Sequence, residues 1–290
     1  MVTSTKLMEK ILFKIAKQWI AGNDINAALE SAKYSYKNGR QAIINKLGEY
    51  DKSKESIETV ISEYNQIISS FRKWNVVGAI SVKPTQVGLS INSKTCLVNF
   101  ERLVVTATKA QVFVWMDMES AEHTDETLEI YFDLFSRYER IGVAIQANLK
   151  RSYNDVKDLV RQGAKIRLVK GAYNENSKIA YKTREQVDSN YSKIMKLLFK
   201  EANEFGIATH DSKLIDEAIK LSKKYPKKFE FQLLKGIRDE LKPKLVKAGF
   251  VTSDYIPYGI NWLPYSIRRL RERKRNILLL GSSFIQSHKV

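Results

Sequence analysis

The sequence predicts an α/β protein: a (β/α)₈ barrel of the TIM type, with extra N-terminal helices and a C-terminal helix over the active site. The 290 residues match the size of one such barrel. Short apolar runs alternate with longer helical patterns, as parallel βα units do. No glycine-rich dinucleotide-binding turn follows any of these runs. Two packed doubly wound halves remain the alternative architecture, although the number of expected strands favours the barrel.

Two amphipathic helices are expected before the barrel, over residues 5–20 and 24–37, and Asp24 is a suitable N-cap for the second. Strands are expected at 42–47, 77–82, 112–118, 142–147, 166–169, 206–209, 229–233 and 251–256. Helical patterns lie between them, at 53–72, 125–138, 152–163, 183–204, 212–224 and 238–248. We therefore expect one barrel domain over 1–290, with N-terminal helices (1–38), the barrel (40–276) and a tail (277–290).

The net charge has two interpretations. The 49 Lys and Arg residues against 32 Asp and Glu residues give +17, which would attract nucleic acid, anionic lipid or acidic metabolites. The basic residues are dispersed, however, as on the Lys- and Glu-rich surfaces of many high-temperature proteins. The chain has no recognised nucleic-acid-binding motif, and aromatic and basic residues are not interleaved in one stretch. We therefore expect no nucleic-acid partner. The hypothesis that competes with this expectation is a basic nucleic-acid-binding module.

Cysteine content and hydropathy bear on the location of the protein. Cys96 is the only cysteine, which excludes a disulfide within the chain. The first residues mix Lys and Glu into apolar positions, unlike a signal peptide, and no window approaches about 18 uninterrupted apolar residues. We expect a cytoplasmic protein. The positive charge and the apolar segment 277–280 with Phe284 add the hypothesis of peripheral contact with the inner membrane face; packing of this tail on the barrel is the alternative.

Polar residues stand at or near the ends of the expected strands, where barrel enzymes carry their chemistry. They are Glu49, Lys83, Asp117, Gln146, Arg167, Thr209, Gln232 and Tyr255. Alternation of side chains points Gly142, Ala144 and Gln146 to the barrel axis, and pairs Ser81 with Lys83, Lys165 with Arg167 and Glu230 with Gln232. One such charge is more often solvated or paired locally, but several converging ones predict a polar binding site, because unpaired buried charges are costly.

The last expected helix, over 261–275, places Tyr265, Arg268 and Arg269 on one face. Two adjacent guanidinium groups beside a phenol suit a small planar carboxylate, which arginine can bind with two hydrogen bonds. The alternative is a solvated basic helix end, which we accept for the basic residues from Arg271 onward.

Seven short strings, in order along residues 40–276, carry a family resemblance. They are Leu47-Gly-Glu49, Ser81-Val-Lys83, Trp115-Met-Asp117, Arg167-Leu-Val-Lys-Gly-Ala-Tyr173, Ala208-Thr-His210, Phe229-Glu-Phe-Gln232, and Tyr265 followed by Arg268-Arg269. Together they resemble the FAD-dependent proline dehydrogenases. The monofunctional form is expected, because the chain is too short to carry an aldehyde dehydrogenase as well. Asn174 and Lys235 depart from the usual aromatic residues of the family pattern.

The resemblance implies a flavoenzyme of proline catabolism. FAD would lie across the carboxyl ends of the strands and take a hydride from C5 of L-proline to its N5 atom, giving 1-pyrroline-5-carboxylate. Electrons would then pass to a quinone, and a pyrroline-carboxylate dehydrogenase would be a downstream partner. Another flavin barrel acting on a different carboxylate, such as a hydroxyproline, is the alternative within this class.

The resemblance also assigns roles to residues. Asp117 and Arg167 would be catalytic, and Glu49 would form a gate with Arg268. The substrate-binding residues would be Lys83, Tyr173, Tyr255, Tyr265, Arg268 and Arg269. The residues in contact with FAD would be Met118, Gln146, Arg167, Val169, Gly171, Thr209 and His210. Phe113 and Trp115 are expected to pack. No metal is expected, because His123, His210 and His288 are scattered along the chain.

Overall fold

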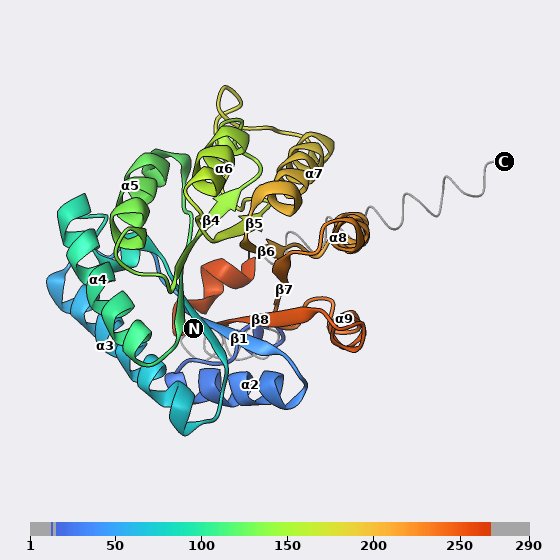
Figure 1. The fold of residues 1–290 in the computed structure, drawn as a ribbon. Coiled ribbons are helices and arrows are strands. Elements are labelled where there is room, and N and C mark those ends of the chain that lie inside the picture. Colours follow the sequence, from blue (N-terminus) through green and yellow to red (C-terminus); the bar gives the residue numbers. More distant parts are fainter. Residues whose placement is uncertain (1–12, 14–15, 268–290) are drawn as a thin grey trace, which may run out of the picture.

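Eight parallel strands form a closed barrel in the computed structural model, which describes residue 13 and residues 16–267 (Figure 1). The strands are β1 (Gln41–Lys46), β2 (Gly78–Val82), β3 (Phe113–Met116), β4 (Ile141–Gln146), β5 (Ile166–Val169), β6 (Glu204–Ala208), β7 (Lys228–Leu234) and β8 (Val251–Tyr258). Each strand pairs with the next in sequence, and β8 pairs with β1 from Gln41↔Ser253 to Lys46↔Tyr258. The predicted barrel is confirmed, and no strand end differs from its expected position by more than two residues.

Helices form a ring outside the strands (Figure 1). They are α2 (Ile25–Lys37), α3 (Lys54–Lys73), α4 (Ser93–Lys109), α5 (Thr124–Phe135), α6 (Ser152–Arg161), α7 (Arg184–Glu201), α8 (Ser212–Lys224) and α9 (Lys242–Lys247), with the short 3₁₀ helices η1 (Pro84–Val87) and η2 (Ala121–His123). The Asp24 cap of α2 is confirmed, since its carboxylate accepts a hydrogen bond from Ala27 N at 2.9 Å. Most of the helix expected at 5–20 lies outside the described residues.

Four helical expectations differ from the structure. The helix expected at 125–138 already ends at Phe135. The helix α4 was not among the predicted patterns. The helix expected at 238–248 begins only at Lys242, because Gly236 and Arg238 adopt φ values of 70° and 54°, which an α-helix does not admit. The pattern expected to remain helical to residue 204 stops at Glu201, because Glu204 pairs with Lys228 in the sheet.

Side-chain alternation in the strands separates an outer core from the barrel interior. Val143 and Ile145 belong to the large apolar core between strands and helices, as predicted. The interior holds a separate apolar cluster made of Ile43, Ala79, Phe113, Trp115 and Tyr255. The small residues of β4 and β6 make room for larger interior groups. A Cβ on Gly142 would lie 2.5 Å from the Trp115 ring, and one on Gly206 would lie 2.7 Å from Gln232 Nε2.

The last described helical segment, residues 262–267, packs at the carboxyl end of the barrel. Trp262 and Tyr265 form an apolar cluster with Trp19 and with Leu47, which directly follows β1. Trp19 Nε1 also donates a hydrogen bond to Ser266 Oγ at 3.0 Å. Figure 1 draws this segment in red against the centre of the ring of strands. Within residue 13 and residues 16–267, none of the helices has the length and apolar character that crossing a membrane requires.

Candidate active site

A buried arginine joins four strands inside the barrel. Arg167, from β5, donates from Nη1 to Asp117 Oδ1 at 2.7 Å and to Ser81 Oγ at 2.7 Å, and from Nε to Gln232 Oε1. Ser81 Oγ donates to the same Asp117 oxygen at 2.8 Å. The other oxygen, Oδ2, accepts a hydrogen bond from Tyr255 OH at 2.9 Å. Arg167 and Ser81 lie 86 positions apart in the chain, and Tyr255 and Asp117 lie 138 positions apart, yet all four share one polar centre.

The electrostatics of this centre depend on its burial. Arg167 is 2% exposed, and burial lowers the pKa of its guanidinium, while the nearby charge of Asp117 raises it. Arg167 stays ionised at neutral pH, because an arginine keeps its proton even after a large shift. Burial, and then the Asp117 charge, raise the pKa of Tyr255 well above 10. Tyr255 is therefore a neutral hydrogen-bond donor over the whole physiological range.

Aromatic rings cover the guanidinium of Arg167. Its Cζ atom lies 4.6 Å from the centroid of Trp115 and 5.5 Å from that of Tyr255. Phe113 packs on Trp115 with ring centroids 4.9 Å apart. The expected packing role of Phe113 and Trp115 is confirmed. The structure adds a cation–π contact, which favours the charged guanidinium at a site with little water.

A second carboxylate lies nearby inside the barrel. Glu230, on β7, accepts hydrogen bonds from Ser253 Oγ and Gln232 Nε2. Burial raises the pKa of Glu230, and these two hydrogen bonds oppose that effect. Gln232 thus connects Glu230 to Arg167, so a continuous polar network crosses the barrel from β3 to β8.

The loops after β2 and β3 are joined through a residue that the sequence did not single out. Glu119 is fully buried, and its carboxylate accepts hydrogen bonds from Thr85 N at 2.9 Å and from Thr85 Oγ1 at 2.6 Å. The same Thr85 hydroxyl accepts a hydrogen bond from Tyr50 N at 3.0 Å. Gln146 Nε2 donates to Glu119 O at 2.8 Å. We call Glu119 and Thr85, with the backbone N–H of Tyr50, the Glu119 anchor. Three predicted site residues, Glu49, Lys83 and Gln146, are adjacent to it.

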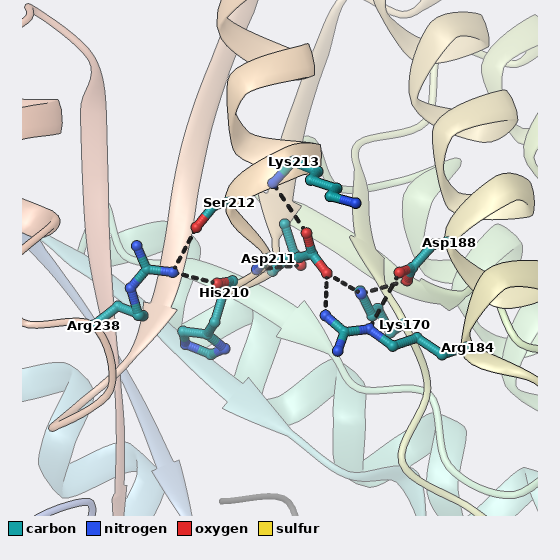
Figure 2. A network of polar contacts seen from close by, with 9 residues as sticks. Lys170, Arg184, Asp188, His210, Asp211, Ser212, Lys213 and Arg238 are labelled. Atoms are coloured by element: carbon teal, nitrogen blue, oxygen red, sulfur yellow. Dashed lines mark hydrogen bonds and ion pairs between the residues drawn. The ribbon is translucent and has the colours of Figure 1, made fainter. Parts of the chain in front are cut away.

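The loops after β5 and β6 are joined by charges instead. Lys170 and Asp211, which follow Val169 and His210, pair with one another and with Arg184 and Asp188 at the start of α7 (Figure 2). We call these four side chains the Asp211 lock. The sequence analysis did not single out any of them, and no local pattern reveals them, because the partners of Asp211 lie 27 and 41 residues away in the chain.

The remaining predicted residues lie around these groups. Gly171 has a φ of 105°, and a Cβ there would lie 2.2 Å from Asn148 Oδ1, so only glycine fits. Asn148 Nδ2 in turn donates to Tyr173 O at 3.5 Å. Lys83 Nζ donates to Asn45 Oδ1 at 3.5 Å. The other buried predicted residues are Met118, Thr209 and Tyr265.

Two expected site residues cannot be placed. Arg268 and Arg269 lie outside the described residues, whereas Tyr265 of the same expected helix face is buried beside Leu47. The part of the chain that the structure describes contains no group of three side chains able to hold a metal ion.

A closed parallel barrel with a buried arginine–carboxylate centre facing the strand ends is the architecture of a barrel enzyme. Comparison with known sequences then gives the family. A family model for proline dehydrogenase matches residues 28–278, so the chain belongs to the proline dehydrogenase family. The family resemblance is confirmed, and the match starts in α2, before the expected start of the barrel at residue 40.

Relatives of similar length support this assignment. Proline dehydrogenase 2 of Bacillus subtilis (strain 168) is 34% identical over 278 residues, which cover 92% of each chain. A proline dehydrogenase of Deinococcus radiodurans is 29% identical over 93% of this chain and 90% of its own length. The chain spans nearly the whole length of these proteins.

Solved structures show the same fold. Proline utilization A from Bdellovibrio bacteriovorus, in a form inactivated by N-propargylglycine, superposes with a TM-score of 0.83 at 24% identity. That likeness covers 92% of this chain but only 33% of the other, so the chain spans about a third of the length of that protein.

The described residues fit the flavin that the family implies. Arg167 Nη2 is buried and has no hydrogen-bond partner among the described residues. A buried donor of this kind is costly unless it finds an acceptor, and the flavin ring carries carbonyl oxygens and nitrogens that accept hydrogen bonds. The guanidinium would be among the residues that hold the ring.

Proposed function

We propose that this protein oxidises L-proline to 1-pyrroline-5-carboxylate with FAD as its cofactor, as the first step of proline catabolism. Family membership supports the reaction, and the observation that carries it is the buried Arg167 with its unpaired Nη2 donor. Bound FAD would supply the acceptor for the hydride of proline C5 and pass its electrons to a quinone. The protein would supply orientation and electrostatics.

The roles of the central residues follow from their contacts. Arg167 holds its positive charge by pairing with Asp117 and offers its unpaired Nη2 to a group that gains negative charge during the reaction. Asp117 fixes both Arg167 and Tyr255. Tyr255, which stays neutral, would present its ring to the substrate.

The remaining assignments extend the proposal outward from this centre. Arg268 and Arg269 would bind the proline carboxylate, Lys83, Tyr173 and Tyr265 would enclose its ring, and Glu49 would gate access. Met118, Gln146, Val169, Gly171, Thr209 and His210 would hold the cofactor. Proline must lose its ammonium proton before C5 gives up a hydride, so activity should rise with pH, and solvent can take this proton.

An anaerobic titration tests the reaction. The purified protein should be yellow, and L-proline should bleach its flavin absorbance in the absence of oxygen. A protein that stays colourless and inert after incubation with FAD contradicts the proposal. Steady-state comparison of proline with hydroxyproline separates the proposed substrate from its nearest alternative.

Arg268→Met tests the carboxylate assignment. Loss of two charge-assisted hydrogen bonds at about 1.5–3 kcal/mol each should raise KM for proline by roughly a hundred-fold or more, with much less change in FAD binding. Arg271→Met is the matched control, since we assign Arg271 to the solvated part of the helix. An unchanged KM would place Arg268 in that solvated part as well.

The cellular context completes the proposal. We propose a single-domain cytoplasmic enzyme that docks at the inner membrane face to reach its quinone, with a pyrroline-carboxylate dehydrogenase consuming its product. The net charge of +17 supports attraction to anionic lipid. Co-sedimentation with anionic liposomes at low salt checks this step, and no binding under those conditions would contradict it.

A further inference from the structure

We propose that the Asp211 lock positions the loops after β5 and β6 for the cofactor and slows its release. This inference rests on the proposed function. Its four members act through other residues and do not touch the reacting atoms, so they are positioning residues.

The lock begins where the strand pairing ends. The last paired residues of β5 and β6 are Val169 and Ala208. Beyond this pair, Lys170 Nζ donates to Asp211 Oδ2 at 3.0 Å, so the two loops stay connected after the backbone ladder stops. The predicted cofactor residues Val169, Gly171, Thr209 and His210 all lie within two residues of Lys170 or Asp211 in the sequence.

The start of α7 completes the lock. Arg184 Nη2 donates to Asp211 Oδ2 at 2.6 Å, and Arg184 Nε donates to Asp188 Oδ2 at 3.4 Å. Lys170 also pairs with Asp188. Two cations and two carboxylates therefore alternate around one closed circuit, which Figure 2 shows at the level of the side chains. The circuit carries no net charge, so no member is left as an uncompensated ion.

Burial makes these ion pairs stronger than ordinary surface pairs. The Asp211 side chain is 8% exposed, those of Lys170 and Asp188 are about one quarter exposed (27% and 26%), and that of Arg184 is 43% exposed, so burial strengthens the Lys170 pairs most. Burial alone would raise the pKa of Asp211, but its hydrogen bonds with Arg184 and Lys170 hold that pKa at about 2. Asp211 is therefore fully ionised at neutral pH, and partly buried ion pairs are screened less by salt than exposed ones.

The same segment is fixed from its other side. His210 Nε2 accepts a hydrogen bond from Leu234 N at 2.9 Å, which requires the ring proton of a neutral imidazole to be on Nδ1. Arg238 Nη1 donates to His210 O and to Ser212 Oγ, both at 3.0 Å. Asp211 Oδ1 also caps α8 by accepting from Lys213 N at 3.0 Å. With its backbone and ring both held, His210 has a defined direction before any ligand binds.

Asp211→Asn separates the lock from the helix cap. Asparagine caps helices about as well as aspartate, so α8 should keep its start while the charge that pairs with Lys170 and Arg184 is lost. The matched control is Glu58→Gln, which breaks the exposed ion pair of Glu58 with Arg102, between α3 and α4. Both changes replace a carboxylate by its amide.

Cofactor retention is the main measurement. The amount of FAD released on dilution is measured by the fluorescence of free flavin. Asp211→Asn should bind FAD roughly five- to thirty-fold more weakly than the unchanged protein. Glu58→Gln should stay within about two-fold of the unchanged protein. At saturating FAD, Asp211→Asn should change kcat and KM for proline less than it changes FAD affinity, because the lock touches neither substrate nor the reacting atoms. Unchanged FAD affinity in Asp211→Asn overturns the inference.

A measurement without cofactor separates this inference from the proposed function. Backbone amide exchange in residues 169–173 and 208–212 should be faster in Asp211→Asn and unchanged in Glu58→Gln. If the unchanged protein binds no FAD, the proposed function and the cofactor role of the lock both fail, and amide exchange alone decides whether the lock holds the loops. If FAD binds equally well to the unchanged protein and to Asp211→Asn, and amide exchange is also the same in both, the proposed role of the lock is wrong while the proposed function stands.

Discussion

The carboxyl end of the barrel, which we call the barrel mouth, has two halves whose loops are joined by different chemistry. On the β2–β3 side, the Glu119 anchor is a fully buried carboxylate surrounded by neutral donors from Thr85. On the β5–β6 side, the Asp211 lock is a circuit of alternating charges that remains partly open to solvent. The Glu119 carboxylate is held mainly by hydrogen bonds from Thr85, whereas Asp211 is paired with long cationic side chains that reach it from other elements.

The opposite pKa shifts of the two carboxylates express this difference. Burial raises the pKa of Glu119, although its hydrogen bonds with Thr85 oppose that rise. For Asp211, burial is outweighed by Arg184 and Lys170, which bring its pKa to about 2. The first site therefore depends on geometry and the second on charge. The Arg167–Asp117 pair connects the two halves, because Asp117 follows β3 and Arg167 belongs to β5.

The largest expected effect comes from breaking this connection. Arg167→Met leaves the partly buried Asp117 carboxylate without its cation, which should cost about 3–5 kcal/mol of the free energy of unfolding. Urea denaturation measures it. Arg102→Met, which breaks an exposed pair with Glu58, is the control and should cost at most about 1 kcal/mol. Equal losses in the two variants would show that Arg167 does not hold the halves together.

Thr85→Val tests the Glu119 anchor. The change preserves side-chain shape but removes the hydroxyl that donates to Glu119 and accepts from Tyr50 N. We expect a loss of about 1–3 kcal/mol, because buried polar groups are left unpaired. Thr59→Val is the control, since the Thr59 hydroxyl bonds only to Glu55 O on an exposed helix face. A loss no larger than that of the control would contradict the anchor.

Asp211→Asn tests the ionic lock through its pH dependence. At neutral pH we expect a loss of about 1–2 kcal/mol. Since the folded-state pKa of Asp211 is about 2 and an unfolded aspartate titrates near about 3.9, the stabilisation is complete above the unfolded value. It is lost as the pH falls toward 2. The difference between variant and unchanged protein, measured by urea denaturation from neutral pH downward, should therefore shrink below about pH 4.

The sequence predicted the strands and the residues at the barrel mouth better than the side-chain interactions that join its loops. Alternation in β4 was enough to direct Gln146 inward. The family strings contain Asp117 and Arg167, and Tyr255 was expected near the end of the last strand; the structure brings these three together. These predictions rest on strand periodicity or on short local strings. Neither kind of signal can reveal a pair such as Lys170 and Asp211, which lie 41 residues apart in the sequence and meet only when β5 and β6 are side by side.

The Glu119 anchor escaped prediction for a related reason. Glu119 looks like one acidic residue in a loop, and only its complete burial against Thr85 distinguishes it from solvated glutamates. The helix α4 was missed although Asn92 is a clear N-cap that accepts from Thr95 N. The use of Arg268 and Arg269 stays a prediction, because both lie beyond the last described residue.

The smallest expected effect is a difference in how salt changes the free energy of unfolding that is lost from the Asp211 lock and from the Glu119 anchor. Raising the ionic strength from about 0.05 M to about 1 M shortens the screening length to about 3 Å, so the loss caused by Asp211→Asn should fall by a few tenths of a kcal/mol. The loss caused by Thr85→Val should stay constant, because a neutral hydroxyl bound to a buried carboxylate is shielded from mobile ions. Chloride is a suitable anion for both titrations, since sulfate strengthens apolar burial in every variant. If the two losses change in parallel with salt, charge does not distinguish the halves of the mouth, and the Asp211 circuit is held by packing and hydrogen bonds in the same way as the Glu119 anchor.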